Sequence, residues 1–253
     1  MKKLIVANLK MNLVSPQERE RYLTSLAKEL QGKKIKNSEI ILCPPFVHLE
    51  AFGKIKNKNI KLGAQNVFSE DGGSYTGEIS PTMLKNFGCE YVILGHSERR
   101  RYFSENNEDI NLKIVAAIKN GLHPILCLGE TKAEKESELT LQIIEKQVQE
   151  CLAGISRTKL EQIIFVYEPI WAVGSDLIPT MNEIMEAKVL IRKILVEMFG
   201  QKYIKNIQIL YGGSVNCKNS KEVCIDPELD GVLVGRESLV PHEFMKIVET
   251  LTN

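Results

Sequence analysis

The chain has 253 residues, of which 43% are hydrophobic and 26% charged, an ordinary balance for a globular protein with a sizeable core. Lys and Arg number 33 against 32 Asp and Glu, so the net charge of +1 gives no electrostatic reason to expect nucleic acid or a membrane surface as partner. No run approaches transmembrane length, and the N-terminal segment reaches Asn8 and Lys10 too soon for a signal peptide, which favours a cytoplasmic location.

Short apolar runs typical of buried strands alternate along the chain with amphipathic segments typical of helices. The helix from 16 starts with Ser15-Pro16, and Ser80-Pro81 is a second start signal. The charged run 132–138 is interpreted as the solvated start of a helix, without further function. Eight strands alternating with helices predict an α/β fold, a single-domain closed (β/α)8 barrel of parallel strands over residues 1–253. The expected strands are 4–9, 39–43, 60–64, 91–94, 123–128, 163–167, 207–211 and 231–234, and the clearest helices are 16–31, 105–120, 133–152, 181–199 and 241–251.

Polar residues follow three of the expected strands where each strand ends, which is where the active sites of such barrels lie. A lone strand-end Lys is usually solvated, and a lone His is more often structural than catalytic. Several such groups on one barrel face favour a site over coincidence. They are Asn8 and Lys10 after the first strand, His96, Ser97 and Glu98 after the fourth, and Glu168 after the sixth.

The segment 163–175 ends a buried strand on the carboxylate of Glu168. Pro169 denies the strand a further ladder donor, so the chain changes direction there. A carboxylate under an apolar lid indicates a general base, whereas a Glu paired with Lys or Arg is the structural alternative, and this segment alone leaves both open. The expected lid consists of Ile170, Trp171, Ala172, Val173 and Gly174.

Glycine-rich turns follow the last two expected strands. Gly213 and Ser214 come after the seventh strand, and Gly235 ends the eighth. Backbone N–H groups in such turns bind anions, and barrels commonly hold a phosphate there. A plain tight turn explains either one alone, but two at this place predict a phosphate site, to which Gly174 adds a donor from the lid.

Seven segments, taken together, resemble the signature segments of the triosephosphate isomerase family and occur in that family's order. The resemblance implies a TIM barrel, usually a homodimer, which interconverts dihydroxyacetone phosphate and D-glyceraldehyde 3-phosphate in glycolysis and gluconeogenesis without cofactor or metal. Six cysteines without a Cys-x-x-Cys pair and four histidines without ligand spacing likewise predict no metal site. The segments are Asn8-Leu9-Lys10-Met11-Asn12, Gln65-Asn66-Val67, Tyr75-Thr76-Gly77-Glu78-Ile79-Ser80, Gly95-His96-Ser97-Glu98-Arg99-Arg100, Cys127-Leu128-Gly129-Glu130, Tyr167-Glu168-Pro169-Ile170-Trp171-Ala172-Val173-Gly174 and Tyr211-Gly212-Gly213-Ser214-Val215.

The same resemblance implies roles for individual residues. Glu168 matches the base that moves a proton between two substrate carbons, and His96 matches the group that polarises the carbonyl. Lys10 matches the cation facing the developing negative charge, with Asn8 beside it. A helix that starts near Ser97 is expected to favour a neutral His96.

Further residues match supporting positions of the family. Glu98 matches a residue next to Lys10, and Tyr211 and Ser214 match the pair that latches the closed lid. Thr76, on the loop 72–78, matches a residue that reaches the site region of a neighbouring subunit, which implies a homodimer.

Two departures from the family pattern leave alternatives open. Arg236 stands where the family usually has a second Gly, and its guanidinium either points to solvent or adds a contact to the phosphate. The segment Ser175–Pro179 is shorter than usual and lacks the family's hinge Gly and Lys, which predicts stiffer or faster lid opening. The alternatives are an isomerase of a four-carbon ketose phosphate and a catalytically silent phosphate-binding dimer.

Overall fold

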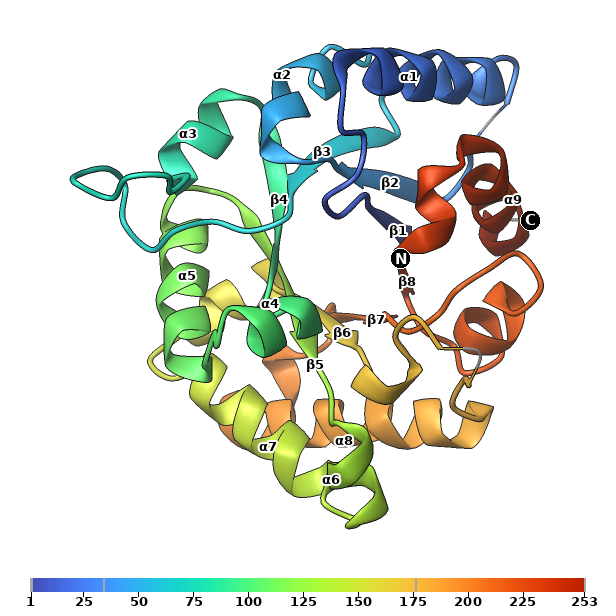
Figure 1. Cartoon of the computed structure of the whole chain (residues 1–253). Helices are drawn as coiled ribbons and strands as arrows, with labels where there is room; N and C mark the ends of the chain where they lie inside the picture. The colour runs from blue at the N-terminus through green and yellow to red at the C-terminus, as the bar shows by residue number, and fades with distance from the viewer. Residues whose placement is uncertain (1, 34, 176, 253) are drawn as a thin grey trace.

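The computed structural model describes residues 2–33, 35–175 and 177–252, within which eight parallel strands close into a barrel surrounded by helices (Figure 1). The strands pair in chain order, and β8 pairs with β1 to close the sheet. The predicted barrel is therefore confirmed, and each strand starts and ends within two residues of its expected bounds. The strands are β1 (Lys3–Asn8), β2 (Ser38–Cys43), β3 (Ile60–Ala64), β4 (Cys89–Leu94), β5 (His123–Leu128), β6 (Ile164–Tyr167), β7 (Gln208–Tyr211) and β8 (Gly231–Val234).

Alternate strand residues build two separate cores. One set points inward and fills the barrel, and the other packs outward against the helices, as the two-residue period of a strand requires. In β6, Ile164 and Val166 belong to the inner core, whereas Phe165 and Tyr167 belong to the outer one. The inner core consists of Leu4, Val6, Ile41, Cys43, Ile93, Ile125, Cys127, Ile164, Val166, Leu210 and Leu233.

Local capping signals set the helix starts. Ser15 accepts a hydrogen bond from the backbone N–H of Glu18 at the start of α1. The single helix predicted over 133–152 is wrong: two helices cover it, because Glu138 between them has φ 57°, outside the helical range. The helices are α1 (Pro16–Leu30), α2 (Leu49–Phe52), α3 (Pro81–Asn86), α4 (Ser97–Tyr102), α5 (Asn107–Lys119), α6 (Lys132–Glu136), α7 (Thr140–Cys151), α8 (Met181–Phe199) and α9 (Pro241–Thr252).

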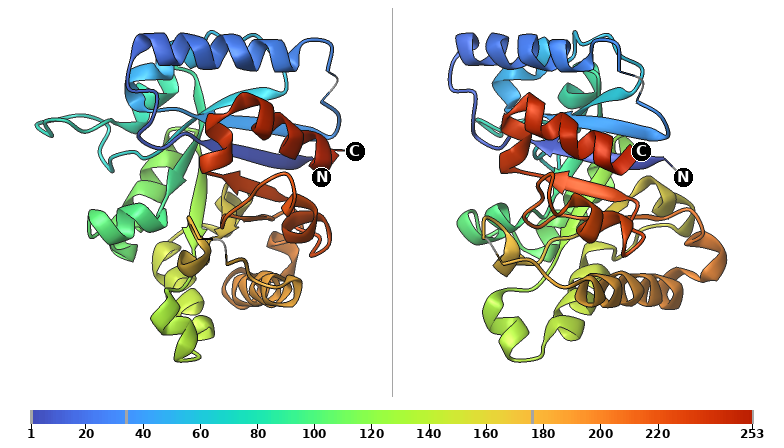
Figure 2. Two further views of the ribbon diagram at one scale, coloured as in Figure 1. Left: turned by 45° about the vertical axis from the view of Figure 1, so that its right-hand side comes forward. Right: turned by 90° about the vertical axis from the view of Figure 1, so that its right-hand side faces the viewer.

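The side views show the helices outside the strands and a loop that stands out from the body of the barrel (Figure 2). This loop joins β3 to α3 and contains Thr76, which is exposed. In the described part of the chain, no helix combines the length and the apolar composition that a membrane span requires.

Candidate active site

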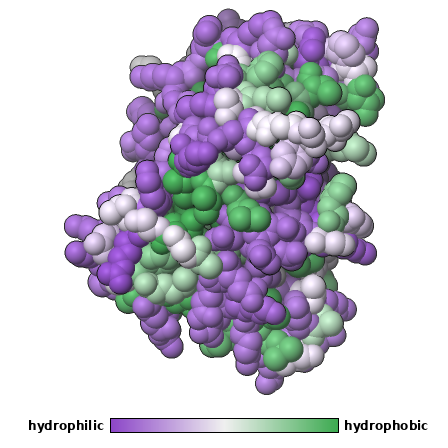
Figure 3. All heavy atoms as spheres, turned by 90° about the vertical axis from the view of Figure 1, so that its left-hand side faces the viewer, coloured by the Kyte–Doolittle hydropathy of each residue, from purple (hydrophilic) through white to green (hydrophobic). Residues whose placement is uncertain are grey.

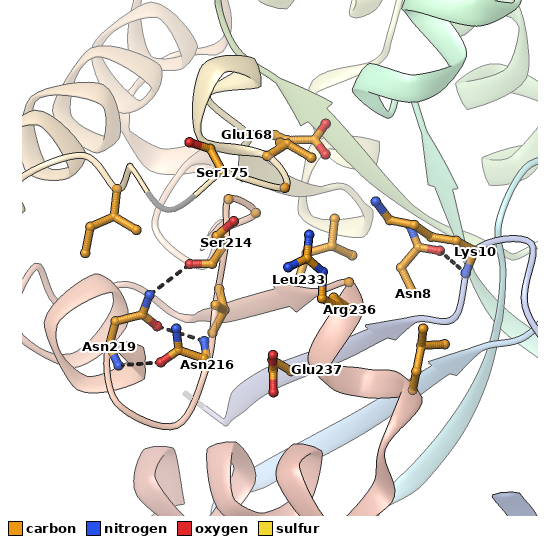
Figure 4. Close-up of a pocket in the computed structure, with 18 of the residues that line it drawn as sticks. Asn8, Lys10, Glu168, Ser175, Ser214, Asn216, Asn219, Leu233, Arg236 and Glu237 are labelled. Carbon is orange, nitrogen blue, oxygen red and sulfur yellow. Dashed lines mark hydrogen bonds between the residues drawn. The ribbon is translucent and has the colours of Figure 1, made fainter.

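The two-residue period of the strands continues beyond their ends and directs polar side chains into the barrel mouth. Glu168 follows Ile164 and Val166 on the inward side of β6, and Asn8 ends β1 in the same way after Val6. Both side chains are buried and line one cavity of about 640 Å³. The side chain of Glu168 is thus a buried part of the cavity lining, and Figure 4 shows it beside the other residues of that lining.

The carboxylate of Glu168 is held by the residues that follow β4. Its Oε2 accepts a hydrogen bond of 2.9 Å from the backbone N–H of Ser97, and its Oε1 lies 3.0 Å from Nε2 of His96. The side chains of Glu168 and His96 are only 2% and 6% exposed. The contact of Oε1 with His96 is short but falls outside strict hydrogen-bond geometry.

Two glycines, Gly129 and Gly212, have no side chain and therefore make room for Glu168. A Cβ at Gly129 would lie 2.1 Å from the carbonyl oxygen of Glu168, and one at Gly212 would lie 2.5 Å from Cγ1 of Val166 and 3.4 Å from Cβ of Glu168. A methyl group at either position would displace the end of β6. These two positions therefore need Gly because of close packing, whatever their part in a turn.

The protonation of the pair follows from its hydrogen bonds and its charges. Burial alone would raise the pKa of Glu168, but His96, the N–H of Ser97 and the charge of Lys10 together lower it, so the carboxylate is ionised. Burial is the largest single influence on His96 and lowers its pKa, but the charge and hydrogen bonding of Glu168 act against it and the net shift is upward. Although this shift favours a protonated ring, Nδ1 of His96 accepts the N–H of Glu98 at 3.2 Å, which only an unprotonated nitrogen can do. This hydrogen bond requires a neutral ring with its proton on Nε2.

Lys10 lies opposite this pair in a backbone conformation that is uncommon for a side-chain-bearing residue, with φ 50°. The amide of Gln65 donates to the carbonyl of Lys10 at 2.9 Å, and the side chain of Asn8 accepts the N–H of Lys10 at 3.1 Å. The Nζ donates to Glu98 at 2.6 Å. Gln65 is a supporting residue whose role the sequence interpretation missed, although its segment is part of the family signature.

The residues predicted to bind a phosphate line the other end of the same cavity. Gly174, Gly213, Ser214, Gly235 and Arg236 all contribute to its wall, together with Asn8, Lys10, His96 and Glu168. A Cβ at Gly235 would lie 3.2 Å from Cε of Lys10, so this Gly brings the two ends of the site close together. Glu98 and Ser97 support the site from α4, as described above.

The described residues hold no group of three or more His, Cys, Asp or Glu side chains arranged to bind a metal ion. The chemistry that the cavity offers comes from an ionised carboxylate, a neutral imidazole N–H and an ammonium group. This set suits the removal and return of a proton next to a carbonyl group.

Comparison with known proteins decides the family. A family model described as triosephosphate isomerase matches residues 3–251. The chain belongs to the triosephosphate isomerase family. It is 46% identical over 250 residues to "Triosephosphate isomerase" of Dictyoglomus thermophilum, covering 98% of this chain and 99% of that protein. It is 43% identical over 249 residues to that of Aquifex aeolicus, with 98% and 99% covered, and 42% identical over 246 residues to that of Moorella thermoacetica, with 97% of each covered.

In this triosephosphate isomerase family member, the segment predicted to form the lid, 170–174, is held by residues on both sides. The backbone N–H and the hydroxyl of Ser214 both donate to the carbonyl of Ala172, at 3.2 and 2.9 Å. Both donors that Ser214 can offer a phosphate are therefore occupied. Ala172 would therefore have to move before Ser214 could bind a phosphate as predicted.

Trp171 holds this segment from its other side. Its indole N–H donates to Glu130 at 2.8 Å, and Nζ of Lys135 lies 3.6 Å from the centre of its ring. Lys135 also pairs at 2.5 Å with Glu183, near the start of α8. The sequence interpretation assigned no role to Glu130 and took the charged run containing Lys135 as solvated surface, so it missed both contacts.

The remaining predicted residues are placed as follows. Pro169 directly precedes the short 3₁₀ helix Ile170–Ala172, and Val173 and Gly174 line the cavity. The hydroxyl of Tyr211 is buried without a hydrogen-bond partner among the described residues, so Tyr211, unlike Ser214, does not bond to the predicted lid in this structure. Within the hinge Ser175–Pro179, Asp176 lies outside the described residues.

Proposed function

We propose that this protein is a triosephosphate isomerase that interconverts dihydroxyacetone phosphate and D-glyceraldehyde 3-phosphate through an enediolate. The observation that carries the proposal is the convergence of Glu168, His96 and Lys10 on one cavity whose other end is rich in backbone donors. The family membership supports the same reaction. No observation favours a four-carbon substrate or a silent dimer over it.

Glu168 is proposed as the base. The hydrogen on the carbon next to a ketone is only weakly acidic, so its removal needs an ionised carboxylate at close range and a stabilised enediolate. Because the pKa of Glu168 is lowered, the carboxylate is ready to accept a proton at neutral pH. It takes the proton from C1 of dihydroxyacetone phosphate and returns it to C2, which gives the aldehyde.

His96 and Lys10 are proposed to stabilise the negative charge that develops on the substrate oxygens. Nε2–H of His96 now faces Oε1 of Glu168 and is released to the carbonyl oxygen when the carboxylate turns toward the carbon. A neutral imidazole donates to the oxygen and can move a proton between O1 and O2, and a neutral His in this role is already a well-known feature of the triosephosphate isomerase family. The Nζ of Lys10 supplies a full positive charge nearby, with Asn8 at its backbone.

The turns after β7 and β8 are proposed to bind the phosphate group. Gly213, Ser214 and Gly235 offer backbone N–H groups, and Gly174 joins them when the lid moves. A closed lid excludes water and so prevents a side reaction in which the enediolate loses its phosphate group. Arg236 lies in the same wall of the cavity. It is the only one of these five residues with a charged side chain.

We further propose that the protein works as a homodimer. Exposed apolar side chains occur in the segments that follow β1 to β4, and apolar side chains gather on the face from which the β3–α3 loop projects (Figure 3). Thr76 on that loop would reach the partner's site region, and sedimentation of the wild type beside a Thr76→Arg variant tests this. A cytoplasmic location and the absence of nucleic-acid and membrane partners stay predictions from the sequence. The exposed side chains include Met11, Val14, Val47, Tyr75, Tyr102 and Phe103.

The experiment is a coupled assay of D-glyceraldehyde 3-phosphate conversion by the wild type, Glu168→Gln and Glu168→Asp. Loss of the base is expected to lower kcat by a factor of about 10²–10⁴, and retraction of the carboxylate by one methylene by about 10². Glu222→Gln is the matched control, because Glu222 lines the same cavity and has no part in the proposed mechanism. Activity that survives Glu168→Gln would refute the assignment, and a slow wild type that turns over a four-carbon ketose phosphate would favour the alternative substrate.

A further inference from the structure

Arg236 places a charged side chain in the cavity wall directly after Gly235 and starts the short helix Arg236–Leu239. Its guanidinium points into the space between Ser214 and Lys10, whereas the carboxylate of Glu237 is directed away from them (Figure 4). Arg236 is exposed, and among the described residues it makes no hydrogen bond and no ion pair. A cation in this position has its donors free for a ligand.

The other charged groups of the cavity are already engaged or lie elsewhere. The Nζ of Lys10 is held by Glu98 at 2.6 Å, and the carboxylate of Glu168 is held by Ser97 and His96. Lys218 also lines the cavity and is exposed. Of the two cations that Figure 4 labels, Lys10 is thus paired with Glu98, whereas Arg236 has no partner among the described residues.

The resting lid adds a reason for a separate anion contact. Both donors of Ser214 are bonded to the carbonyl of Ala172, so they are closed to an arriving phosphate until the lid moves. A guanidinium needs no such release, and its planar pair of N–H groups matches two phosphate oxygens. An arriving phosphate can therefore contact Arg236 before it contacts Ser214.

We infer that Arg236 is a specificity-determining residue that docks the phosphate dianion of the substrate before the lid releases Ser214. The inference rests on the proposed function and deepens it, because it adds a side-chain cation to a site otherwise built from backbone donors. Free phosphate binds through the same contact. The contact forms in the ground state and persists through the reaction, so it acts on KM and leaves kcat nearly unchanged.

Inorganic phosphate is the probe, and its binding is measured by calorimetry at constant ionic strength, with steady-state kinetics on the same samples. Arg236→Gln is expected to weaken phosphate binding about 10-fold and to raise KM about 10-fold with kcat within about 3-fold. Arg236→Lys keeps the positive charge but loses the planar pair of N–H groups, so we expect an effect on phosphate binding and KM between those of the wild type and Arg236→Gln. Lys218→Met is the matched control, which removes one positive charge from the same wall and changes both quantities less than about 3-fold.

Equal effects of Arg236→Gln and Lys218→Met would overturn the inference, because the cavity would then respond to net charge alone. Unchanged phosphate binding in Arg236→Gln would also overturn it, as would a loss confined to kcat. Circular dichroism of each variant establishes that the fold is retained. If the wild type binds phosphate through Arg236 but does not isomerise triose phosphates, the proposed function fails while this contact stands.

Discussion

Replacing Glu105 with Gln removes the negative charge from a buried network that holds α4 against α5. Oε1 of Glu105 accepts Nε of Arg99 at 3.0 Å and Nζ of Lys113, and that Nζ also donates to Asn66 at 3.1 Å. The side chains of Glu105 and Lys113 are 3% and 11% exposed. Because α4 carries Ser97 and Glu98, the network supports the active site as well as the fold.

The expected cost follows from the burial of the charges that remain. Lys113 loses its ionic partner inside the protein, and breaking a buried pair in this way costs about 3–5 kcal/mol. Arg99 adds little, because its side chain is 27% exposed and stacks over Phe103 at 4.8 Å. Oε2 of Glu105 has no partner among the described residues, so the wild-type pair is not optimal. We therefore expect the free energy of unfolding to fall by about 3 kcal/mol.

The pH dependence separates the charge from mere packing. Burial alone would raise the pKa of Glu105, but Lys113 and Arg99 lower it below its usual value of 4.5. A group with a lowered folded-state pKa contributes its full stability above the unfolded-state pKa and loses it as the pH falls through the folded value. The difference between wild type and Glu105→Gln should thus stay constant from about pH 6 to about pH 8 and shrink below about pH 4.5.

The assay is urea denaturation at one fixed protein concentration, because stability would depend on concentration if the proposed dimer forms. The double variant Glu105→Gln, Lys113→Met removes both charges and should recover much of the loss. A loss under about 1 kcal/mol at pH 7, or a difference that persists unchanged at about pH 3, would refute the reasoning.

Two further predictions concern the surroundings of Glu168 and the lid. Gly129→Ala places a Cβ where it would meet the carbonyl oxygen of Glu168 at 2.1 Å, so we expect a kcat about 100-fold lower and a loss of at least about 1–3 kcal/mol in unfolding free energy; normal activity in the coupled assay would contradict this. Lys135→Met removes the cation from the ring of Trp171, so acrylamide quenching of this single Trp should increase, and unchanged quenching would show that Lys135 does not hold the lid.

The fold was predictable because its signal is repeated. Eight apolar runs, each a few residues long, are compatible with few arrangements of parallel strands joined by crossovers. An error in one helix therefore does not change the predicted fold. The helix over 133–152 failed for a local reason. The amphipathic pattern continues through the region, but Glu138 adopts a left-handed conformation that the hydrophobic pattern does not predict.

The site was predictable only as far as strand ends and family motifs specify it. Glu168 and Asn8 could be placed because each directly continues the alternation of a strand, and His96 because it follows a strand closely. Gln65, Glu130 and Lys135 act through contacts with distant segments, and sequence spacing does not carry that information. The same holds for Gly129, whose packing against Glu168 exists only once β5 and β6 are side by side.

In the proposed mechanism, two contacts must be broken before the reaction can start, and both depend on the same segment. Glu168 has to leave the N–H of Ser97 to reach a substrate carbon, and Ala172 has to leave Ser214 to free the phosphate donors. Pro169 joins Glu168 directly to the lid, so a displacement of the lid also moves the backbone that carries the base. Binding of the phosphate can therefore position the carboxylate at the opposite end of the cavity. In this arrangement, binding energy from the non-reacting phosphate is used to assemble the reacting groups.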